Sequence, residues 1–367
     1  MKTLFRSRRN PRGMAALLAM TLGLGIVLQV SAPPSGALPV TFTGSFFVTY
    51  GRRSPTDIET NASWPSGFVE ITRTSRGNYT LFAASLSGAG NAQLTVLGPG
   101  APLPLCSVTR TTVSSSGTTL KVRCSSATTG KTADAGFSLF YNSDRSPSAG
   151  RHYAVLTTSK SNRSHTPSNQ FRAEPGAAPL TVTRSARGAY MVTFPAEDFP
   201  NNGGILFVSA AGTSARYCNL AGWWGTPVTA WVNCYSRTGS PADSLFSLLA
   251  TEGNLGGYVS PGPFLSVFRP SYSTGNFGSA WHFTGAGGTD TSRNEFQPGR
   301  STVVGGNLAG GGSLFAIVST YGLPTANRCA PGVIRVDSPD VVFEVQCFTP
   351  AGYPTGDASY TLGALMP

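Results

Sequence analysis

Short runs of alternating apolar and polar residues recur along the chain and predict β-strands. Typical runs are Phe46–Tyr50 and Leu120–Cys124. Each run is rich in β-branched and aromatic residues and is bounded by Gly, Pro, Asn or Ser, as antiparallel strands are. The helix formers Glu, Lys and Gln are sparse, which also favours strands over helices. We therefore expect an all-β protein.

The strand pattern repeats with a period of about 111 residues, which is the strongest signal in the sequence. The segment Val69–Tyr79 returns as Leu180–Tyr190, and a fainter match surrounds Gly299. Two cysteines and one aspartate recur in register with it. The first cysteines are Cys106, Cys218 and Cys329, the second are Cys124, Cys234 and Cys347, and the aspartates are Asp134, Asp243 and Asp357. The chain therefore carries three tandem copies of one unit.

Each copy divides into two sets of four predicted strands, and two architectures fit this division. Six sets of four short strands indicate a six-bladed β-propeller, whose radial closure would protect the sheet edges. The alternative is three consecutive β-sandwich modules, because one copy has about the length and strand count of a sandwich. In either case the predicted copies span residues 38–148, 149–259 and 260–367.

The repeat selects one cysteine pairing among the many that six cysteines allow. Each copy should contain its own disulfide, since its two cysteines lie on neighbouring predicted strands. The predicted bridges are Cys106–Cys124, Cys218–Cys234 and Cys329–Cys347. A zinc site is the alternative, but two cysteines per copy without a nearby His or third Cys form a poor ligand set. We expect no metal ion.

Residues 1–37 have the order of a secretory signal peptide. Lys2 and four arginines precede the apolar stretch Met14–Val30, and the small residues Ser35 and Ala37 follow it. An uncleaved membrane anchor is the alternative, because the stretch is about as long as the shortest spanning helices. No later segment is long and apolar enough to cross a bilayer. The sequence thus predicts a secreted, extracellular protein without a membrane span after removal of the leader.

The charge distribution argues against nucleic acid as a partner. The whole chain has a formal net charge of +11, but five of its 27 basic residues lie in the leader, which contains no acidic residue. The remainder carries 22 basic and 16 acidic residues and shows no run of basic residues. Nucleic-acid binding needs a cluster of basic residues, and the sequence after the leader has none. We therefore predict that the protein does not bind nucleic acid.

Catalytic signatures are missing from the sequence. There is no Gly-x-Ser-x-Gly elbow, no His-Glu-x-x-His and no phosphate-binding loop. A glycosidase needs two carboxylates that face one cleft, whereas the candidates here are scattered. The histidines are His152, His165 and His282, and the carboxylates considered are Glu70, Glu197, Asp198 and Glu344. We therefore predict no catalytic residue and no cofactor.

The aspartate that recurs before the last strand of each copy has two interpretations. Asp134, Asp243 and Asp357 could offer hard oxygen ligands to calcium. Only one carboxylate occurs per loop, however, and the EF-hand spacing is absent. The favoured interpretation is an Asx-turn that closes the hairpin before the last strand.

Trp223 and Trp224 are the candidate ligand-binding residues. They follow Cys218 in a predicted loop and are flanked by Gly222 and Gly225. Adjacent residues on a strand face opposite sides, so at least one indole could be exposed and stack on a sugar ring or an aromatic ligand. The alternative, which the sequence favours, is that both are buried at the junction of two blades or modules.

Copy two carries a longer motif. It runs from Thr183-Arg184 through Gly188, Tyr190 and Phe194 to Cys218, Trp223 and Cys234, and it ends in Ser240–Phe246. In this pattern the copies resemble a repeat of uncharacterised secreted proteins of actinobacteria and myxobacteria. Copy three lacks the tyrosine after Gly299 and has no Trp between its cysteines. The resemblance implies export and assigns no activity or functional residue.

These observations favour a secreted, non-enzymatic binding protein that recognises a glycan or a cell-envelope component through loops of a rigid β scaffold. A structural or extracellular-matrix repeat protein is the first alternative, and a glycan-active enzyme is the second. The sequence leaves the oligomeric state unspecified.

Overall fold

The structure is a computed structural model, and its described residues all lie between Thr41 and Pro367. It describes residues 45–50, 58–62, 68–88, 90–98, 102–143, 153–172, 178–194, 205–225, 227–251, 264–269, 282–284, 291–297, 299–305, 315–322, 326–356 and 358–365. The predicted signal peptide lies outside these ranges. Every helix or strand assigned within them is a β-strand, which confirms the all-β prediction.

The strands fall into three sets of eight, one for each copy of the repeat, which we call modules 1, 2 and 3. Module 1 contains β1 (Ser45–Tyr50), β2 (Ile58–Ala62), β3 (Val69–Ser75), β4 (Asn78–Ala84), β5 (Asn91–Leu97), β6 (Leu105–Ser114), β7 (Gly117–Ser125) and β8 (Gly136–Asn142).

Module 2 contains β9 (Tyr153–Thr157), β10 (Asn169–Arg172), β11 (Thr181–Ala186), β12 (Ala189–Thr193), β13 (Ile205–Ala211), β14 (Arg216–Trp224), β15 (Thr229–Ser236) and β16 (Leu245–Thr251).

Module 3 contains β17 (Phe264–Arg269), β18 (His282–Thr284), β19 (Thr291–Gln297), β20 (Arg300–Gly305), β21 (Phe315–Tyr321), β22 (Arg328–Asp337), β23 (Asp340–Phe348) and β24 (Ser359–Leu365).

Each module is a sandwich of two four-stranded antiparallel layers, and four of the six layers join in pairs into two eight-stranded sheets that run from one module into the next. In module 1 the strand orders are β2-β1-β8-β5 and β3-β4-β7-β6, and modules 2 and 3 repeat both orders. The core of module 1 lies between its two sheets, since Leu81 and Leu120 from one sheet pack with Leu94 and Leu139 from the other. The described sheets thus match the alternative of three sandwich modules. They do not form six propeller blades, because the first strand of each module pairs with the last strand of the same module: β1 with β8, β9 with β16 and β17 with β24.

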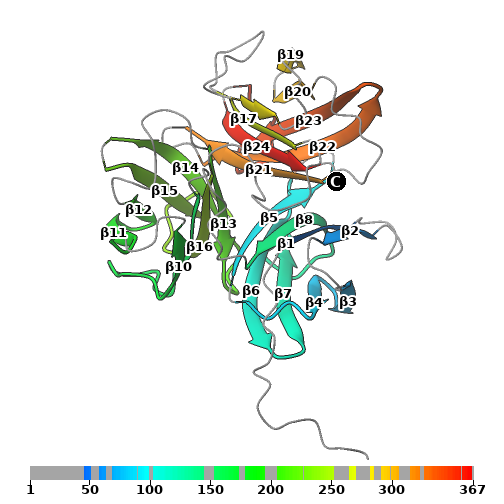
Figure 1. The fold of residues 1–367 in the computed structure, drawn as a ribbon. Helices are drawn as coiled ribbons and strands as arrows, with labels where there is room; N and C mark the ends of the chain where they lie inside the picture. Colours follow the sequence, from blue (N-terminus) through cyan, green and yellow to red (C-terminus); the bar gives the residue numbers. More distant parts are fainter. Residues whose placement is uncertain are drawn as a thin grey trace, which may run out of the picture. The chain divides into compact units, whose positions relative to one another are not determined.

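Burial along the strands differs between the two sheets of each module. Strands β4 and β12 alternate between buried and partly buried residues, because one face packs on the core and the other faces outward. Strands β5, β13 and β21 are instead buried along most of their length. Figure 1 shows these three strands closest to the centre of the unit. Their second face is covered by the neighbouring modules.

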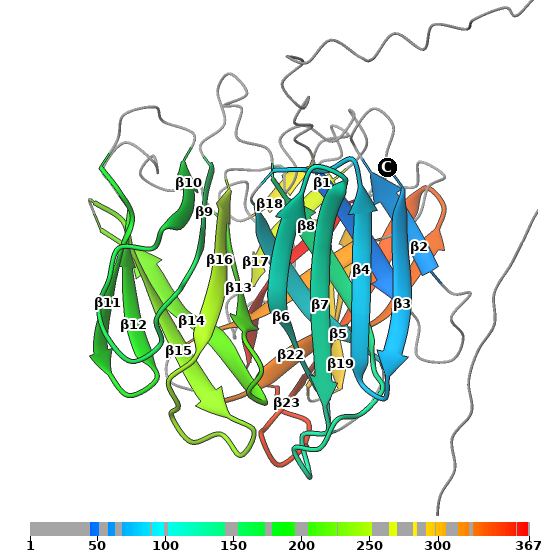
Figure 2. The same ribbon diagram turned by 90° about the horizontal axis from the view of Figure 1, so that it is seen from below.

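The modules are joined edge to edge by backbone hydrogen bonds. The end of β13 pairs with β6 of module 1 at Ala211 and Val108, and Figure 2 shows the two strands as neighbours. In the same way β21 pairs with β14 of module 2 at Tyr321 and Leu220. A hydrogen bond from β5 to β22 links modules 1 and 3. The three bonds run from Gly212 N–H to Val108 O at 2.9 Å, from Gly322 N–H to Leu220 O at 2.9 Å, and from Gly98 N–H to Pro331 O at 3.5 Å. Equivalent residues make all three bonds, so the modules form a closed ring.

Three hydroxyl groups repeat this cyclic arrangement in the interior. Thr95, Ser209 and Ser319 occupy equivalent positions on β5, β13 and β21, and each donates to a backbone carbonyl of another module. The bonds are Thr95 to Val318 O at 3.3 Å, Ser209 to Leu94 O at 3.0 Å and Ser319 to Val208 O at 3.2 Å. Because buried hydroxyls require partners, these bonds fix the modules against one another.

All three predicted disulfides are present and join paired strands. In each, the two cysteines are direct cross-strand neighbours with Cα atoms 4.0 Å apart. The bridges are Cys106–Cys124, Cys218–Cys234 and Cys329–Cys347. Disulfides of this kind are typical of extracellular proteins. Within the described part of the chain there is no helix with the length and hydrophobicity needed to cross a membrane.

Candidate functional site

Trp223 and Trp224 lie at the end of β14, not in a loop as predicted. The strand continues past Cys218 to Trp224, and a bulge between Leu220 and Gly222 shifts its register against β15. After the bulge Gly222 faces Trp231, and Trp224 faces Thr229. A bulge bends a strand and redirects its side chains, and here it places two neighbouring indoles in different environments.

Trp223 packs into the junction of modules 2 and 3. It is partly buried against the core of module 2, and its ring meets Tyr321 edge to face at a centroid distance of 5.2 Å. Tyr321 belongs to β21 of module 3. The predicted burial at a module junction therefore describes this tryptophan, and its role is structural.

Trp224 is exposed on the opposite side of the strand. Its side chain is 58% exposed, and its ring stacks on Trp231 at a centroid distance of 3.6 Å and an interplanar angle of 18°. The ring lies over Gly222, where a Cβ atom would collide with it. The glycine thus allows the two indoles to stack, and together they form a rigid aromatic platform on module 2.

Trp231 is a tryptophan that the sequence analysis did not single out as a ligand-binding residue. It lies seven residues beyond Trp224, on the other strand of the same hairpin. The β14–β15 hairpin could have been predicted from the cysteine pair. The pairing of Trp231 with Gly222 could not, because it depends on the bulge.

The repeated aspartate forms an ion pair in module 1. Asp134 accepts hydrogen bonds from Nε and Nη2 of Arg73 at 2.9 and 2.7 Å. It also accepts from the Gly77 backbone N–H at 2.8 Å and the Tyr79 hydroxyl at 3.2 Å. Hydrogen bonding to Arg73 holds the pKa of this carboxyl well below its usual range. The aspartate therefore ties the last strand to the distant β3–β4 turn.

Module 2 repeats this cluster. Asp243 accepts from Nε and Nη2 of Arg184 at 2.9 and 3.0 Å, and from Gly188 N–H at 2.8 Å. The hydrogen bond from Arg184 lowers the pKa of Asp243. Burial raises the pKa of Tyr190 to about 12, so its phenol stays protonated and donates to Asp243 at 3.3 Å. The oxygens of both aspartates are thus engaged by the protein, and Asp357 lies outside the described residues.

The other titratable candidates do not converge. Glu70 is exposed on β3 of module 1, whereas Glu344 lies on β23 of module 3 and pairs with Arg300 at 2.6 Å. His165 forms a backbone bridge with Val182, and His282 lies on β18. The remaining candidates, His152, Glu197 and Asp198, lie outside the described residues.

Among the residues that the structure describes, no group of three His, Cys, Asp or Glu side chains could hold a metal ion. The stacked, exposed indole of Trp224 on Trp231 is the candidate ligand-binding feature of the described residues. Comparison of the chain with protein-family models, with curated proteins and with solved structures gives no match.

Proposed function

We propose that the protein is an exported, non-enzymatic binding protein that recognises a glycan through Trp224 and Trp231. The observation that carries this proposal is the exposed, stacked indole pair on a rigid strand hairpin. A large aromatic face left in water can bind the apolar face of a sugar ring. Indole side chains are also common anchors of binding energy in protein interfaces.

The surroundings of the platform favour binding without rearrangement. The hairpin of β14 and β15 is closed by the Cys218–Cys234 disulfide. The ring of Trp224 stacks on Trp231 and lies over Gly222. Its side chain therefore has little conformational freedom to lose when a ligand binds. Such preorganisation increases affinity because it lowers the entropic cost of association.

Export is supported by two independent features. Residues 1–37 have the charge and hydrophobicity pattern of a signal peptide. The three disulfides suit an oxidising compartment outside the cytoplasm. A glycan of a cell envelope or of the extracellular space is the ligand class that this location makes available.

A structural role is the second candidate, and the closed ring of modules favours it. Hydrogen bonds join all three pairs of modules, and buried hydroxyls of β5, β13 and β21 reinforce the centre. Such a rigid unit would suit an extracellular matrix. It would need no exposed aromatic platform, which is why we rank it below glycan binding.

The test measures binding of the protein without residues 1–37 to a glycan array and to isolated cell envelopes. Trp224→Ala should weaken binding at least about tenfold, since loss of a central aromatic anchor costs about 2 kcal/mol. Tyr353→Ala is the matched control, because this side chain is also exposed, at 72%, but lies on module 3. Both variants should unfold at the temperature of the wild type.

Each outcome decides between the candidate functions. Saturable binding that Trp224→Ala weakens and Tyr353→Ala leaves intact supports the proposal. If both variants retain binding, the ligand binds elsewhere, and the proposed role of Trp224 and Trp231 is wrong. Absence of binding to glycans and envelopes would favour the structural role.

A further inference from the structure

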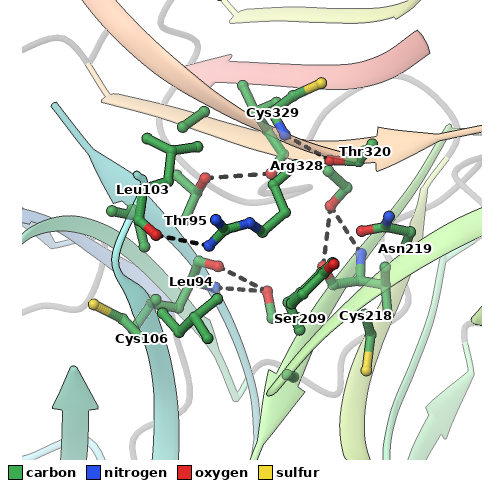
Figure 3. Close-up of a pocket in the computed structure, with 18 of the residues that line it drawn as sticks. Leu94, Thr95, Leu103, Cys106, Ser209, Cys218, Asn219, Thr320, Arg328 and Cys329 are labelled. Atoms are coloured by element: carbon green, nitrogen blue, oxygen red, sulfur yellow. Dashed lines mark hydrogen bonds between the residues drawn. The ribbon is translucent and has the colours of Figure 1, made fainter. Parts of the chain in front are cut away.

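All three modules contribute to one cavity at the centre of the ring (Figure 3). Its volume is about 80 Å³. A water molecule needs only about 10–15 Å³ measured in this way, so the cavity can hold a small organic ion or several waters. Leu94, Ser209 and Ser319 represent the three modules in its wall. It is separate from the aromatic platform, since Trp224 and Trp231 do not line it.

Arg328 extends into this cavity from the start of β22 (Figure 3). The residue is only 5% exposed. Its Nη1 donates to the carbonyl of Leu103 at 2.7 Å, and its guanidinium carbon lies 5.3 Å from the ring centre of Tyr217. One side chain of module 3 thereby contacts modules 1 and 2 at once.

The other edge of this guanidinium is unsatisfied. Nε and Nη2 of Arg328 are buried and have no hydrogen-bond partner among the described residues. In Arg73 and Arg184 the same two nitrogens form the fork that binds a carboxylate at both oxygens. The fork of Arg328 is thus chemically equivalent to two forks that hold a carboxylate elsewhere in this protein.

The described residues of the cavity wall offer no negative charge to balance Arg328. Arg216 is among them, whereas no described lining residue is Asp or Glu. A buried charge without a counterion is costly, and burial lowers the pKa of Arg328 accordingly. A guanidinium nevertheless keeps its proton in proteins, so the site can be neutralised only by an anion.

The charge is a departure from the repeat. The residue before the first cysteine is Leu105 in module 1, Tyr217 in module 2 and Arg328 in module 3. Leu105 and Tyr217 are buried and pack together in one apolar cluster. An apolar residue therefore satisfies this position structurally, and the packing of the ring does not require an arginine.

We propose that the central cavity binds a small carboxylate or another small oxyanion through Nε and Nη2 of Arg328. Two parallel charge-assisted hydrogen bonds to one planar group are the strongest contact a guanidinium makes. Both nitrogens are shielded from solvent in the structure, so the proposed binding requires the guanidinium to turn on its methylene chain until they face the ligand. Asn219 and Thr320 line the same cavity and add polar groups beside the ligand.

The test uses the protein without residues 1–37 in a buffer free of oxyanions. Formate, acetate and phosphate are titrated by calorimetry at constant ionic strength, with chloride as the background anion. We expect saturable binding of one oxyanion per chain. At a hundredfold excess over the dissociation constant, the unfolding temperature should rise by about 3–6 °C.

Three variants test whether this response depends on the fork of Arg328. Arg328→Met removes the fork and should abolish binding and the temperature shift, without lowering the unfolding temperature in chloride. Arg335→Met is the matched control, because Arg335 is exposed on the same strand and pairs with Asp337. It should bind as the wild type does. Trp224→Ala should also keep the response, which separates this site from the proposed glycan site.

Two results would overturn the proposal. A wild type that shows no saturable response to any of the three oxyanions overturns the proposal, as does a response that Arg328→Met retains. If Arg328→Met fails to fold, Arg328→Lys serves in its place. Lysine keeps the charge but lacks the planar fork, so binding should weaken at least about tenfold.

Discussion

Modules 1 and 2 differ from module 3 in the side chains that hold the last strand. In modules 1 and 2 an arginine four residues before the turn glycine binds the repeated aspartate. Module 3 has Glu295 at the arginine position and Ser301 at the position of Tyr79 and Tyr190. There Tyr360 on the last strand bonds Ser301 at 2.8 Å, so the phenol reaches the core from the opposite sheet.

The backbone beneath these side chains is the same in all three modules. The turn glycines have φ angles of +69°, +71° and +77° at Gly77, Gly188 and Gly299. Each turn glycine accepts a hydrogen bond from the N–H of the second cysteine, at 2.7–2.8 Å. The comparison indicates that the glycine turn and the disulfide are common to all modules. The polar contacts that hold the last strand differ, since the Arg–Asp ion pair of modules 1 and 2 is replaced in module 3.

Removal of a disulfide should have the largest effect and should be equal in different modules. The sequence separations are 16 residues for Cys218–Cys234 and 18 for Cys329–Cys347. Loop closure of this size contributes about 3 kcal/mol. The pairs Cys218→Ala/Cys234→Ala and Cys329→Ala/Cys347→Ala should each lower the free energy of unfolding by this amount, as measured in urea. If only one of the two double variants lost stability, the disulfide would not have the same role in every module.

The turn glycines should be the next most sensitive positions. Gly188→Ala and Gly299→Ala each force an L residue into the left-handed region, and the new Cβ would collide with backbone atoms near the second cysteine. We expect a loss of about 2 kcal/mol in both modules. Gly98→Ala is the control, because its φ of +135° is also positive but no atom lies within 4 Å of a Cβ there. A control as destabilised as the turn variants would remove the steric argument.

The exchanged tyrosine should show a coupling specific to module 3. Ser301 and Tyr360 are both buried, so Ser301→Ala or Tyr360→Phe alone should cost about 1–2 kcal/mol. The double variant should lose less than the sum of the two, because both partners of one bond are removed together. Thermal unfolding of all four proteins measures this coupling. Strict additivity would show that the hydroxyl pair is not the element that replaces the ion pair.

The ion pair should appear as a small acid-sensitive contribution in module 2. Hydrogen bonding to Arg184 lowers the pKa of Asp243 in the folded protein. Its stabilisation is therefore complete above the ordinary aspartate pKa near 4 and is lost as the pH falls through the lower folded value. Asp243→Asn should cost about 1 kcal/mol at pH 7 and flatten the stability profile below pH 4. An unchanged acid profile would contradict this assignment.

Most strands could be predicted because alternation and turn residues act locally. The predicted runs Phe46–Tyr50 and Leu120–Cys124 fall within β1 and β7. Prediction failed where these local signals were weak. Strand β19 contains a single apolar residue, Phe296, and so shows no alternation that predicts a strand. Strand β14 extends through a bulge into the predicted loop. The second error concealed the stacking of Trp224 on Trp231.

The sequence by itself determined the three copies, the all-β class and the disulfide pairing. These properties follow from spacings within one hairpin or from comparison of one copy with the next. Only the tertiary structure decided between propeller and sandwiches, because β1 pairs with β8 across a whole module. It also decided the ring and the surroundings of Arg328, since these depend on contacts between modules. Such contacts form between strands far apart in sequence, and no local pattern specifies which edges meet.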